Sequence, residues 1–170
     1  GEKNPNLRIQ LLGSGTILRE VIAAADILKE EYGIISDIWS VTSFNELRRE
    51  ALDATRWNML HPAEKPRKSY VESCLEKREG PVVAATDYMK IFADQIREFV
   101  PGKYRVLGTD GFGRSDTREK LRQFFEVDRY YVTVAALKSL AEDGKISSEK
   151  VVEAINKYNI DPDKPNPTKV

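Results

Sequence analysis

Two glycine-containing segments carry residue types that can bind an anion or a polar ligand, and the first is Gly13-Ser14-Gly15. It follows the apolar run 7–12 and opens a segment of helical periodicity, where backbone amides and the helix dipole can hold a phosphate. Leu18 stands where the dinucleotide-binding pattern needs its last glycine, and no Lys-Thr pair follows as in a P-loop. We therefore interpret this segment as a tight structural turn, with a phosphate cradle over 13–16 as the alternative.

The second segment, 108–116, is the densest cluster of glycine and polar residues in the chain, and it follows an expected strand. Ligands of open α/β sheets usually bind at the carboxyl ends of the strands. Asp110 and Arg114 can form an ion pair or a hydrogen-bonding clamp, whereas Asp116 is expected to cap a helix. We expect this loop, with Phe112, to lie at a subunit or domain contact. The alternative is that it reaches an active site.

The single histidine, His61, limits the metal and nucleophilic chemistry that the chain can perform. One histidine and one cysteine cannot form a zinc signature, and no second ligand stands at a recognised spacing. We predict that His61 is a packing or interface residue. Trp57, Met59 and Leu60 precede it in what we expect to be an irregular segment, and they mark an interface if they are exposed.

Two further candidates have simple structural interpretations. Cys74 falls within a helical pattern, which favours an inert buried thiol over a nucleophile. Asp87 and Lys90 stand at the start of an expected helix, where the aspartate can cap the first turn and the lysine can be solvated. No spacing in the sequence pairs a nucleophile with an acid or a base, so we assign no catalytic, cofactor-binding or metal-binding residue.

The composition favours one globular domain spanning residues 1–170. The chain is 41% hydrophobic, with 27 basic and 27 acidic side chains, so its formal net charge is zero. This balance gives no polybasic footprint for nucleic acid. No apolar run approaches the roughly 20 residues of a membrane-spanning helix. We expect a soluble, cytoplasmic protein without nucleic-acid or membrane partners.

The hydrophobic periodicity alternates between strand and helix. Apolar or β-branched runs predict strands at 7–12, 37–41, 81–86 and 104–107. Ser43 with Glu46, and Ser69 with Glu72, have the spacing of a capping box, which predicts a helix over 44–51 and a short helix ending at 75. A long irregular excursion is expected between them, from 53 to 69. Further helices are expected after 15, after Asp87, from Asp116, and over 128–142 and 148–158, followed by an extended tail over 161–170.

This alternation predicts a three-layer α/β/α domain with a mostly parallel sheet, because parallel neighbours need crossover helices that cover both sheet faces. Four strands are evident in the pattern. We expect about five, with the fifth in the excursion or near 125–127, and one strand can be antiparallel.

Several runs resemble one enzyme family. They are Ile9-Gln10-Leu11-Leu12-Gly13-Ser14-Gly15, Trp39-Ser40-Val41-Thr42-Ser43-Phe44-Asn45-Glu46-Leu47, Arg56-Trp57-Asn58-Met59-Leu60-His61-Pro62, Thr86-Asp87-Tyr88-Met89-Lys90 and the stretch 107–128. In this order they are similar to the homodimeric bacterial decarboxylating component of pyruvate dehydrogenase, and the similarity covers nearly the whole chain. The matching part of that family is the last of three domains, a transketolase-type C-terminal domain.

The resemblance implies a function for a larger parent chain. In that family, pyruvate is decarboxylated on thiamine diphosphate with magnesium, and the product reductively acetylates a lipoyl group of the dihydrolipoyl acetyltransferase. The cofactor lies between the two preceding domains, across the dimer interface. The family's cofactor motif, a Gly-Asp-Gly opening a segment that ends in Asn-Asn, is absent from this sequence, and so is an identifiable activating glutamate. The resemblance therefore implies that residues 1–170 alone bind no cofactor and are inactive.

The same resemblance implies a structural role and three partners: the remaining domains of the same chain, the second subunit of a homodimer, and the acetyltransferase. We expect the domain to extend the dimer contact and to support the cofactor-binding domains, with the 108–116 loop and the 57–62 segment as contact surfaces. Two alternatives remain open. One is a docking module for the acetyltransferase or its lipoyl arm, and the other is an independent nucleotide-binding α/β domain that uses the 13–16 turn.

Overall fold

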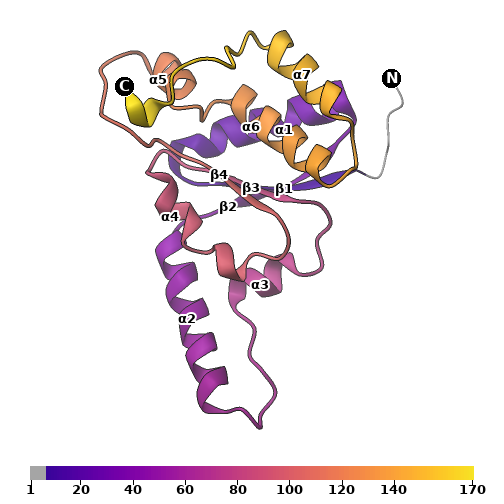
Figure 1. Cartoon of the computed structure of the whole chain (residues 1–170). Coiled ribbons are helices and arrows are strands. Elements are labelled where there is room, and N and C mark those ends of the chain that lie inside the picture. The colour runs from indigo at the N-terminus through magenta and orange to yellow at the C-terminus, as the bar shows by residue number, and fades with distance from the viewer. Residues whose placement is uncertain (1–6) are drawn as a thin grey trace.

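The computed structural model describes residues 7–170, which form an α/β domain around a single sheet (Figure 1). The described residues contain four strands: β1 (Arg8–Gly13), β2 (Ile35–Ser40), β3 (Val82–Ala85) and β4 (Tyr104–Leu107). Their order in the sheet is β2-β1-β3-β4, and every neighbouring pair is parallel. The predicted α/β class is confirmed, but the expected number of strands was one too high for this part of the chain. The first half of the excursion is helical, its second half forms no strand, and residues 125–127 follow a helix without pairing to the sheet.

Helices cover both faces of the sheet and make the third layer that the alternation predicted. On one face α1 (Leu18–Tyr32) and α6 (Arg129–Glu142) pack side by side, with α7 (Ser148–Lys157) against α6 and α5 (Arg118–Phe124) near the sheet edge. The other face carries α2 (Phe44–Leu60), α3 (Tyr70–Leu75) and α4 (Lys90–Asp94). Three short 3-10 turns complete the fold: η1 (Gly15–Ile17), η2 (Arg97–Phe99) and η3 (Pro167–Lys169).

Two hydrophobic cores lie on opposite sides of the sheet, because successive side chains of a strand point to opposite faces. Leu11 of β1 and Val83 of β3 face α1 and α6, whereas Leu12 and Val82 face α2, α3 and α4. Strands buried on both faces read as continuous apolar runs, which is why β1 and β3 were visible in the sequence. β2 is an edge strand, and its Ile35 and Ile38 remain 39% and 42% exposed.

The capping residues explain where most helices begin. Ser43 accepts a hydrogen bond from the amide of Glu46, Ser69 from that of Glu72, and Asp128 from those of Tyr130 and Tyr131, which confirms three predicted helix starts. Two predicted caps are wrong. Thr117, not Asp116, accepts from the first turn of α5, and Asp87 makes no cap bond to α4.

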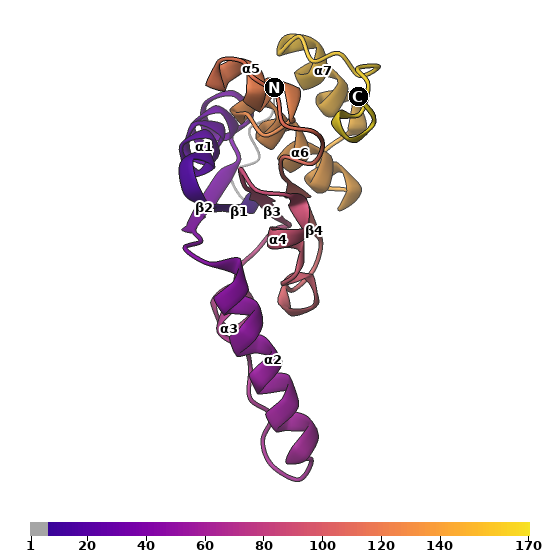
Figure 2. The same cartoon turned by 90° about the vertical axis from the view of Figure 1, so that its left-hand side faces the viewer.

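The helix expected to end at residue 51 continues to Leu60, so the segment containing Trp57 and Met59 is helical rather than irregular. The second half of α2 and the returning segment 61–69 project from the body as an arm (Figures 1 and 2). No sheet lies beneath this half of the helix, so its sequence lacks the broad apolar stripe by which a buried helix is identified. The helix ends at Leu60, with His61 as its C-cap, because Pro62 immediately after cannot continue it.

The segment 161–170 is tied to the body of the domain. The ammonium of Lys164 donates to the carbonyl of Phe124 and pairs with Glu126 at 3.2 Å. Pro167, at the start of η3, is buried. The tail therefore lies against α5 and the 108–116 loop.

Candidate functional site at the carboxyl edge of the sheet

Three loops meet where β1, β3 and β4 end, because the carboxyl ends of parallel strands lie at the same sheet edge. They are 14–17, 86–89 and 108–116. The hydroxyl of Ser14 donates to that of Thr86 at 2.8 Å and joins the first loop to the second. The amide and hydroxyl of Thr109 donate to the carbonyls of Tyr88 and Asp87, at 2.9 and 2.7 Å, and join the second to the third.

Asp110 fixes the third loop to α4. Its carboxylate accepts a hydrogen bond from the amide of Lys90 at 2.8 Å and satisfies a free donor of the first helical turn. Gly108 permits this approach, because a Cβ there would lie 2.8 Å from the nitrogen of Lys90. The expected ion pair between Asp110 and Arg114 does not form among the described residues. The guanidinium of Arg114 instead stacks over the ring of Phe124, 4.1 Å from its centroid.

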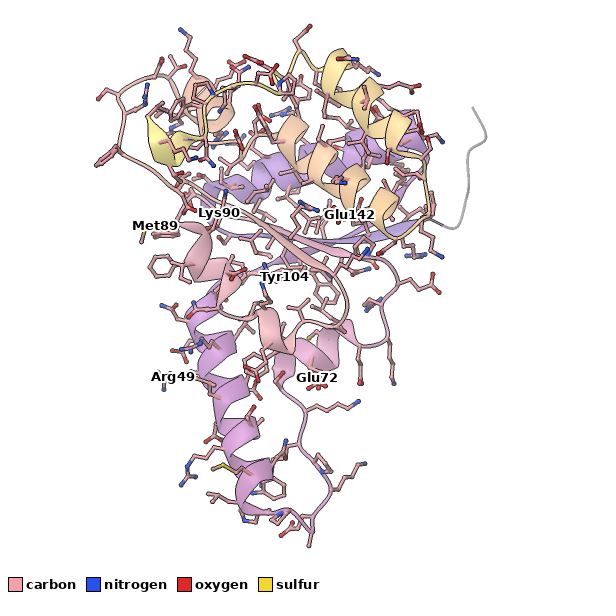
Figure 3. All side chains as sticks on the ribbon, viewed as in Figure 1. Arg49, Glu72, Met89, Lys90, Tyr104 and Glu142 are labelled. Atoms are coloured by element: carbon pink, nitrogen blue, oxygen red, sulfur yellow. The ribbon has the colours of Figure 1, made fainter. Side chains whose placement is uncertain are left out.

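The carboxyl edge also exposes large apolar side chains. We call Tyr88, Met89, Ile91, Phe92 and Phe112 the edge surface; they are 64%, 52%, 62%, 37% and 79% exposed. Tyr88 and Met89 immediately precede α4, and Ile91 and Phe92 lie in its first turn; Met89 lies at the outer margin of the molecule in Figure 3. Clustered exposed apolar side chains mark contact sites on soluble domains. This placement favours the interpretation of Phe112 as an interface residue.

The backbone of the Gly13-Ser14-Gly15 turn requires glycine at both positions. A Cβ on Gly13 would lie 2.9 Å from the backbone of Leu18, and Gly15 has a φ of 56° in the left-handed region. The carboxylate of Asp87 lies beside Gly15 and accepts a hydrogen bond from the hydroxyl of Thr16 at 3.2 Å. A negative charge at this position repels a phosphate, so the geometry favours the tight turn over the phosphate cradle.

A cleft of about 350 Å³ opens between this turn and α5. Its lining includes Thr16, Asp87 and Thr109 on one side and three arginines, Arg114, Arg118 and Arg122, on the other. We call it the arginine cleft. The sequence prediction included Arg114 but missed the two arginines of α5, whose spacing of four residues places both on one helix face.

A buried glutamate holds one of the cleft's arginines, Arg122, in position. Glu20 of α1 is 5% exposed, and its carboxylate accepts hydrogen bonds from Arg122 at 2.8 Å and from Arg129 at 3.0 Å. Burial raises the pKa of Glu20, but the hydrogen bonds and positive charges of the two arginines outweigh it and hold the pKa below its usual value. Glu20 therefore remains ionised and holds Arg122 in a fixed position.

The other predicted site residues lie at the tip of the arm and are not brought together with the 108–116 loop (Figure 1). Trp57 stacks on His61 with 4.3 Å between ring centroids, and the Arg67 guanidinium lies 3.8 Å from the Trp57 ring. Asn58 donates to the carbonyl of Arg67 at 2.9 Å and accepts from its amide at 2.7 Å. These contacts close the arm, whereas Met59 is 70% exposed.

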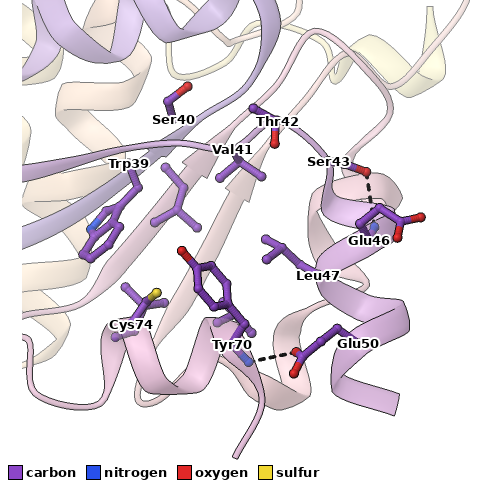
Figure 4. A pocket seen from close by; sticks show the side chains of 13 residues that line it. Trp39, Ser40, Val41, Thr42, Ser43, Glu46, Leu47, Glu50, Tyr70 and Cys74 are labelled. Atoms are coloured by element: carbon purple, nitrogen blue, oxygen red, sulfur yellow. Dashed lines mark hydrogen bonds between the residues drawn. The ribbon is translucent and has the colours of Figure 1, made fainter. Parts of the chain in front are cut away.

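Cys74 is half-buried in an apolar pocket of about 490 Å³ between β2, α2 and α3 (Figure 4). Trp39, Leu47 and Tyr70 line the same pocket, and Glu50 accepts a hydrogen bond from the amide of Tyr70 at its rim. A hydrogen bond with the thiol of Cys74 raises the pKa of Tyr70. This contact makes the phenol of Tyr70 a weaker acid and gives the thiol no basic partner, so the pocket does not activate Cys74 as a nucleophile.

Between residues 7 and 170, no three His, Cys, Asp or Glu side chains are grouped so that they could hold a metal ion. Within the same range, no helix has both the length and the apolar character to cross a bilayer.

Comparison with known proteins identifies the family. Residues 1–128 match the model of the transketolase-like TK C-terminal domain. The chain belongs to this family. Two solved transketolases share the fold of this C-terminal domain: a split-gene transketolase described as an inactive β4 tetramer (TM-score 0.55, 18% identity, 79% of this chain and 39% of that one) and the transketolase from Leishmania mexicana (TM-score 0.50, 18% identity, 81% and 17%).

The sequence relatives of this transketolase-like domain are pyruvate dehydrogenase E1 components. The chain is 64% identical to that of Cupriavidus necator over 171 aligned residues, which cover 100% of this chain and 19% of the relative. It is 64% identical to that of Pseudomonas aeruginosa and 58% identical to that of Escherichia coli K12, each over 94% of this chain and 18% of the relative. The chain thus spans about a fifth of the length of these relatives.

Proposed function

We propose that this chain is the C-terminal domain of a pyruvate dehydrogenase E1 component. The observation that carries the proposal is the 64% identity that extends over the whole chain. The parent enzyme decarboxylates pyruvate with thiamine diphosphate and magnesium, and it transfers the acetyl group to the lipoyl group of dihydrolipoyl acetyltransferase in the cytoplasm. This activity belongs to the assembled parent, and residues 1–170 alone are expected to be inactive.

The residues of this chain do not fit a thiamine diphosphate site. The segment by which the family holds the diphosphate and magnesium, a Gly-Asp-Gly that opens a run ending in Asn-Asn, does not occur in this sequence. The glycine turn that could approach a diphosphate faces the carboxylate of Asp87. We therefore place the cofactor in other domains of the parent and assign no chemical step to this chain.

The role we propose for the domain is to support those other domains and the second subunit of a homodimer through the edge surface. Five large apolar side chains at one sheet edge would remain in water in an isolated domain, and burying each of them stabilises a contact by about 1 to 3 kcal/mol. The bonds of Thr109 and Asp110 hold the 108–116 loop against α4 and keep this surface in one arrangement.

The test uses the full-length parent enzyme with Ile91→Ser and Phe112→Ser. Losing apolar anchors of a contact typically costs about 2 kcal/mol of binding free energy. We therefore expect the dissociation constant of the dimer, measured by light scattering over a concentration series, to rise about 30-fold, with a parallel loss of turnover. Val152→Ser is the matched control, because Val152 is 55% exposed on α7, away from the edge. A double variant that assembles and turns over like the wild type would contradict the proposal.

A second candidate role, docking of the acetyltransferase, is favoured by the arm. Leu52, Met59 and Leu60 are 41%, 70% and 52% exposed, and their spacing places them on one face of α2. The parent carrying Met59→Ser and Leu60→Ser would lose capture of purified acetyltransferase if the arm docks it, while the dimer remains intact. Unchanged capture would exclude this role.

The third alternative, nucleotide binding at the 13–16 turn, is disfavoured by the carboxylate of Asp87 beside Gly15.

A further inference from the structure

The arginine cleft has the features of a small-ligand site that the proposed structural role does not require. Its volume of about 350 Å³ falls within the usual range for small-molecule pockets, roughly 300–1,000 Å³. It opens at the carboxyl edge of β1, β3 and β4, the position at which open parallel sheets bind their ligands. The hydroxyl-bearing residues Thr16 and Thr109 line it opposite α5.

The three guanidinium groups of the cleft retain most of their hydrogen-bond donors. An arginine side chain carries five N–H donors, and Arg122 uses Nη1 alone, on Glu20, among the contacts of residues 7–170. Arg114 is held by stacking over Phe124 and makes no hydrogen bond in that range. Arg118 lies within 4 Å of no described carboxylate and is exposed. Two of the three arginines are therefore held in place while their donors stay available.

The charges that face the cleft favour an anion. Three guanidinium groups line it against a single carboxylate, that of Asp87, which lies on the opposite side beside Thr16. The charge of Glu20 does not cancel this excess, because Arg129 outside the cleft shares it. Like charges on one helix face destabilise the helix, so a bound anion stabilises the local structure by relieving the repulsion between Arg118 and Arg122.

We propose that the arginine cleft binds the phosphate group of a small ligand. Guanidinium groups pair with phosphate through parallel N–H···O bonds, and a phosphate has enough oxygens to serve three of them, whereas a carboxylate has two. The phosphate lies on the α5 side of the cleft, away from Asp87. Asp87 and the hydroxyl of Thr109 can accept hydrogen bonds from a hydroxyl or amino group elsewhere on the ligand.

The experiment is calorimetric titration of the 170-residue chain with inorganic phosphate, at an ionic strength held constant with sodium chloride. We expect one saturable site per chain. Arg118→Gln removes charge-assisted hydrogen bonds and should weaken phosphate binding about 10-fold or more. Because Arg118 is exposed and has no described ion-pair partner, this variant should keep the unfolding temperature of the wild type. Arg48→Gln, which removes an exposed arginine from α2, is the matched control and should bind phosphate normally.

A second anion, malonate, sharpens the test. Malonate carries the same charge as phosphate on two carboxylates, and it should bind about 10-fold more weakly if the phosphate geometry decides. Equal affinity for malonate would overturn the assignment to phosphate. The absence of saturable binding, or equal binding by Arg118→Gln and the wild type, would overturn the site itself. Neither outcome depends on the assembly of the parent enzyme, so the proposed structural role is tested separately.

Discussion

The carboxylate of Asp110 accepts a hydrogen bond from the backbone amide of Lys90 at 2.8 Å, so α4 is capped by a residue twenty positions further along the chain. The 108–116 loop and the first turn of α4 are consequently one structural unit. Since α4 carries Ile91 and Phe92 of the edge surface, the conformation of the loop determines how that surface is presented.

We expect Asp110→Ala to lower the free energy of unfolding by about 1 kcal/mol, as the loss of a helix cap typically does. Asp110→Asn keeps an oxygen that can accept from Lys90 and should retain most of the stability. Urea denaturation followed by circular dichroism measures both variants. If alanine and asparagine were equally destabilising, the charge of Asp110 rather than its cap bond would be the stabilising factor.

The contact between Gly111 and Pro167 gives a second prediction. Gly111 has a φ of 124°, and a Cβ there would lie 2.4 Å from the carbonyl oxygen of Pro167. Gly111→Ala should therefore destabilise the chain by about 1 to 3 kcal/mol and release the tail from the loop. Gly113→Ala is the control, because no heavy atom lies within 4 Å of its added Cβ. Thermal unfolding that is the same for both variants would show that the tail does not hold the loop.

The layered fold could be predicted because its signals are local. β1 and β3 are apolar runs buried on both faces, and Ser43, Ser69 and Asp128 stand directly before the helices that they cap. Such signals depend on residues a few positions apart, which a single sequence displays. No comparable apolar run supported the expected fifth strand. It was placed in the 53–69 excursion or near 125–127 without such a signal.

The length of α2 was underestimated because half of it lies outside the core. The apolar stripe fades after Ala51, and we interpreted that loss of periodicity as the end of the helix. A better signal was present: no glycine or proline occurs between Phe44 and His61, so nothing in the backbone ends the helix before Pro62.

The arrangement of the candidate site was not visible in the sequence, because its contacts join distant residues. Arg122 binds Glu20 across 102 positions, and the cap of α4 comes from a loop after the next strand. Capping rules that search only nearby positions chose Asp87, which instead accepts a hydrogen bond from Thr16. The residues of the 108–116 loop were identified, whereas their partners needed the tertiary structure.

The ion pairs of the buried Glu20 with Arg122 and the partly exposed Arg129 predict a pH dependence of stability. The pKa of Glu20 is lowered in the folded state, so its contribution is fully present above the ordinary carboxyl pKa and is lost as the pH falls through the lower folded pKa. Glu20→Gln should lower the free energy of unfolding by about 2 kcal/mol at neutral pH. The loss should be smaller in acid, because the Glu20 carboxylate of the wild type is then protonated and has also lost its charge. Urea denaturation between about pH 7 and pH 3 measures the difference. If the wild type and Glu20→Gln differed by the same free energy of unfolding at every pH, an ionic role would be contradicted. Glu153→Gln, at an exposed position of α7, is the control and should unfold with the same free energy as the wild type throughout.

The closing contacts of the arm predict local rather than global instability. Asn58 makes two hydrogen bonds to the backbone of Arg67 and holds the returning segment against α2. Asn58→Ala should weaken this closure by about 1 to 2 kcal/mol, which corresponds to a roughly 5- to 30-fold rise in local opening, while the core, built from other elements, keeps its midpoint of unfolding.

Limited digestion with trypsin measures this opening, because Arg67 and Lys68 lie on the returning segment and neither is followed by proline. Arg56→Ala, on an exposed part of α2, removes one cleavage site elsewhere and leaves the closing bonds intact, so digestion within the returning segment should proceed at the wild-type rate. If Asn58→Ala were cleaved there no faster than this control, the stacking of Trp57 with His61 and Arg67 would suffice to keep the arm closed. If instead its global unfolding midpoint fell, the arm would be coupled to the core and could not act as a separate unit.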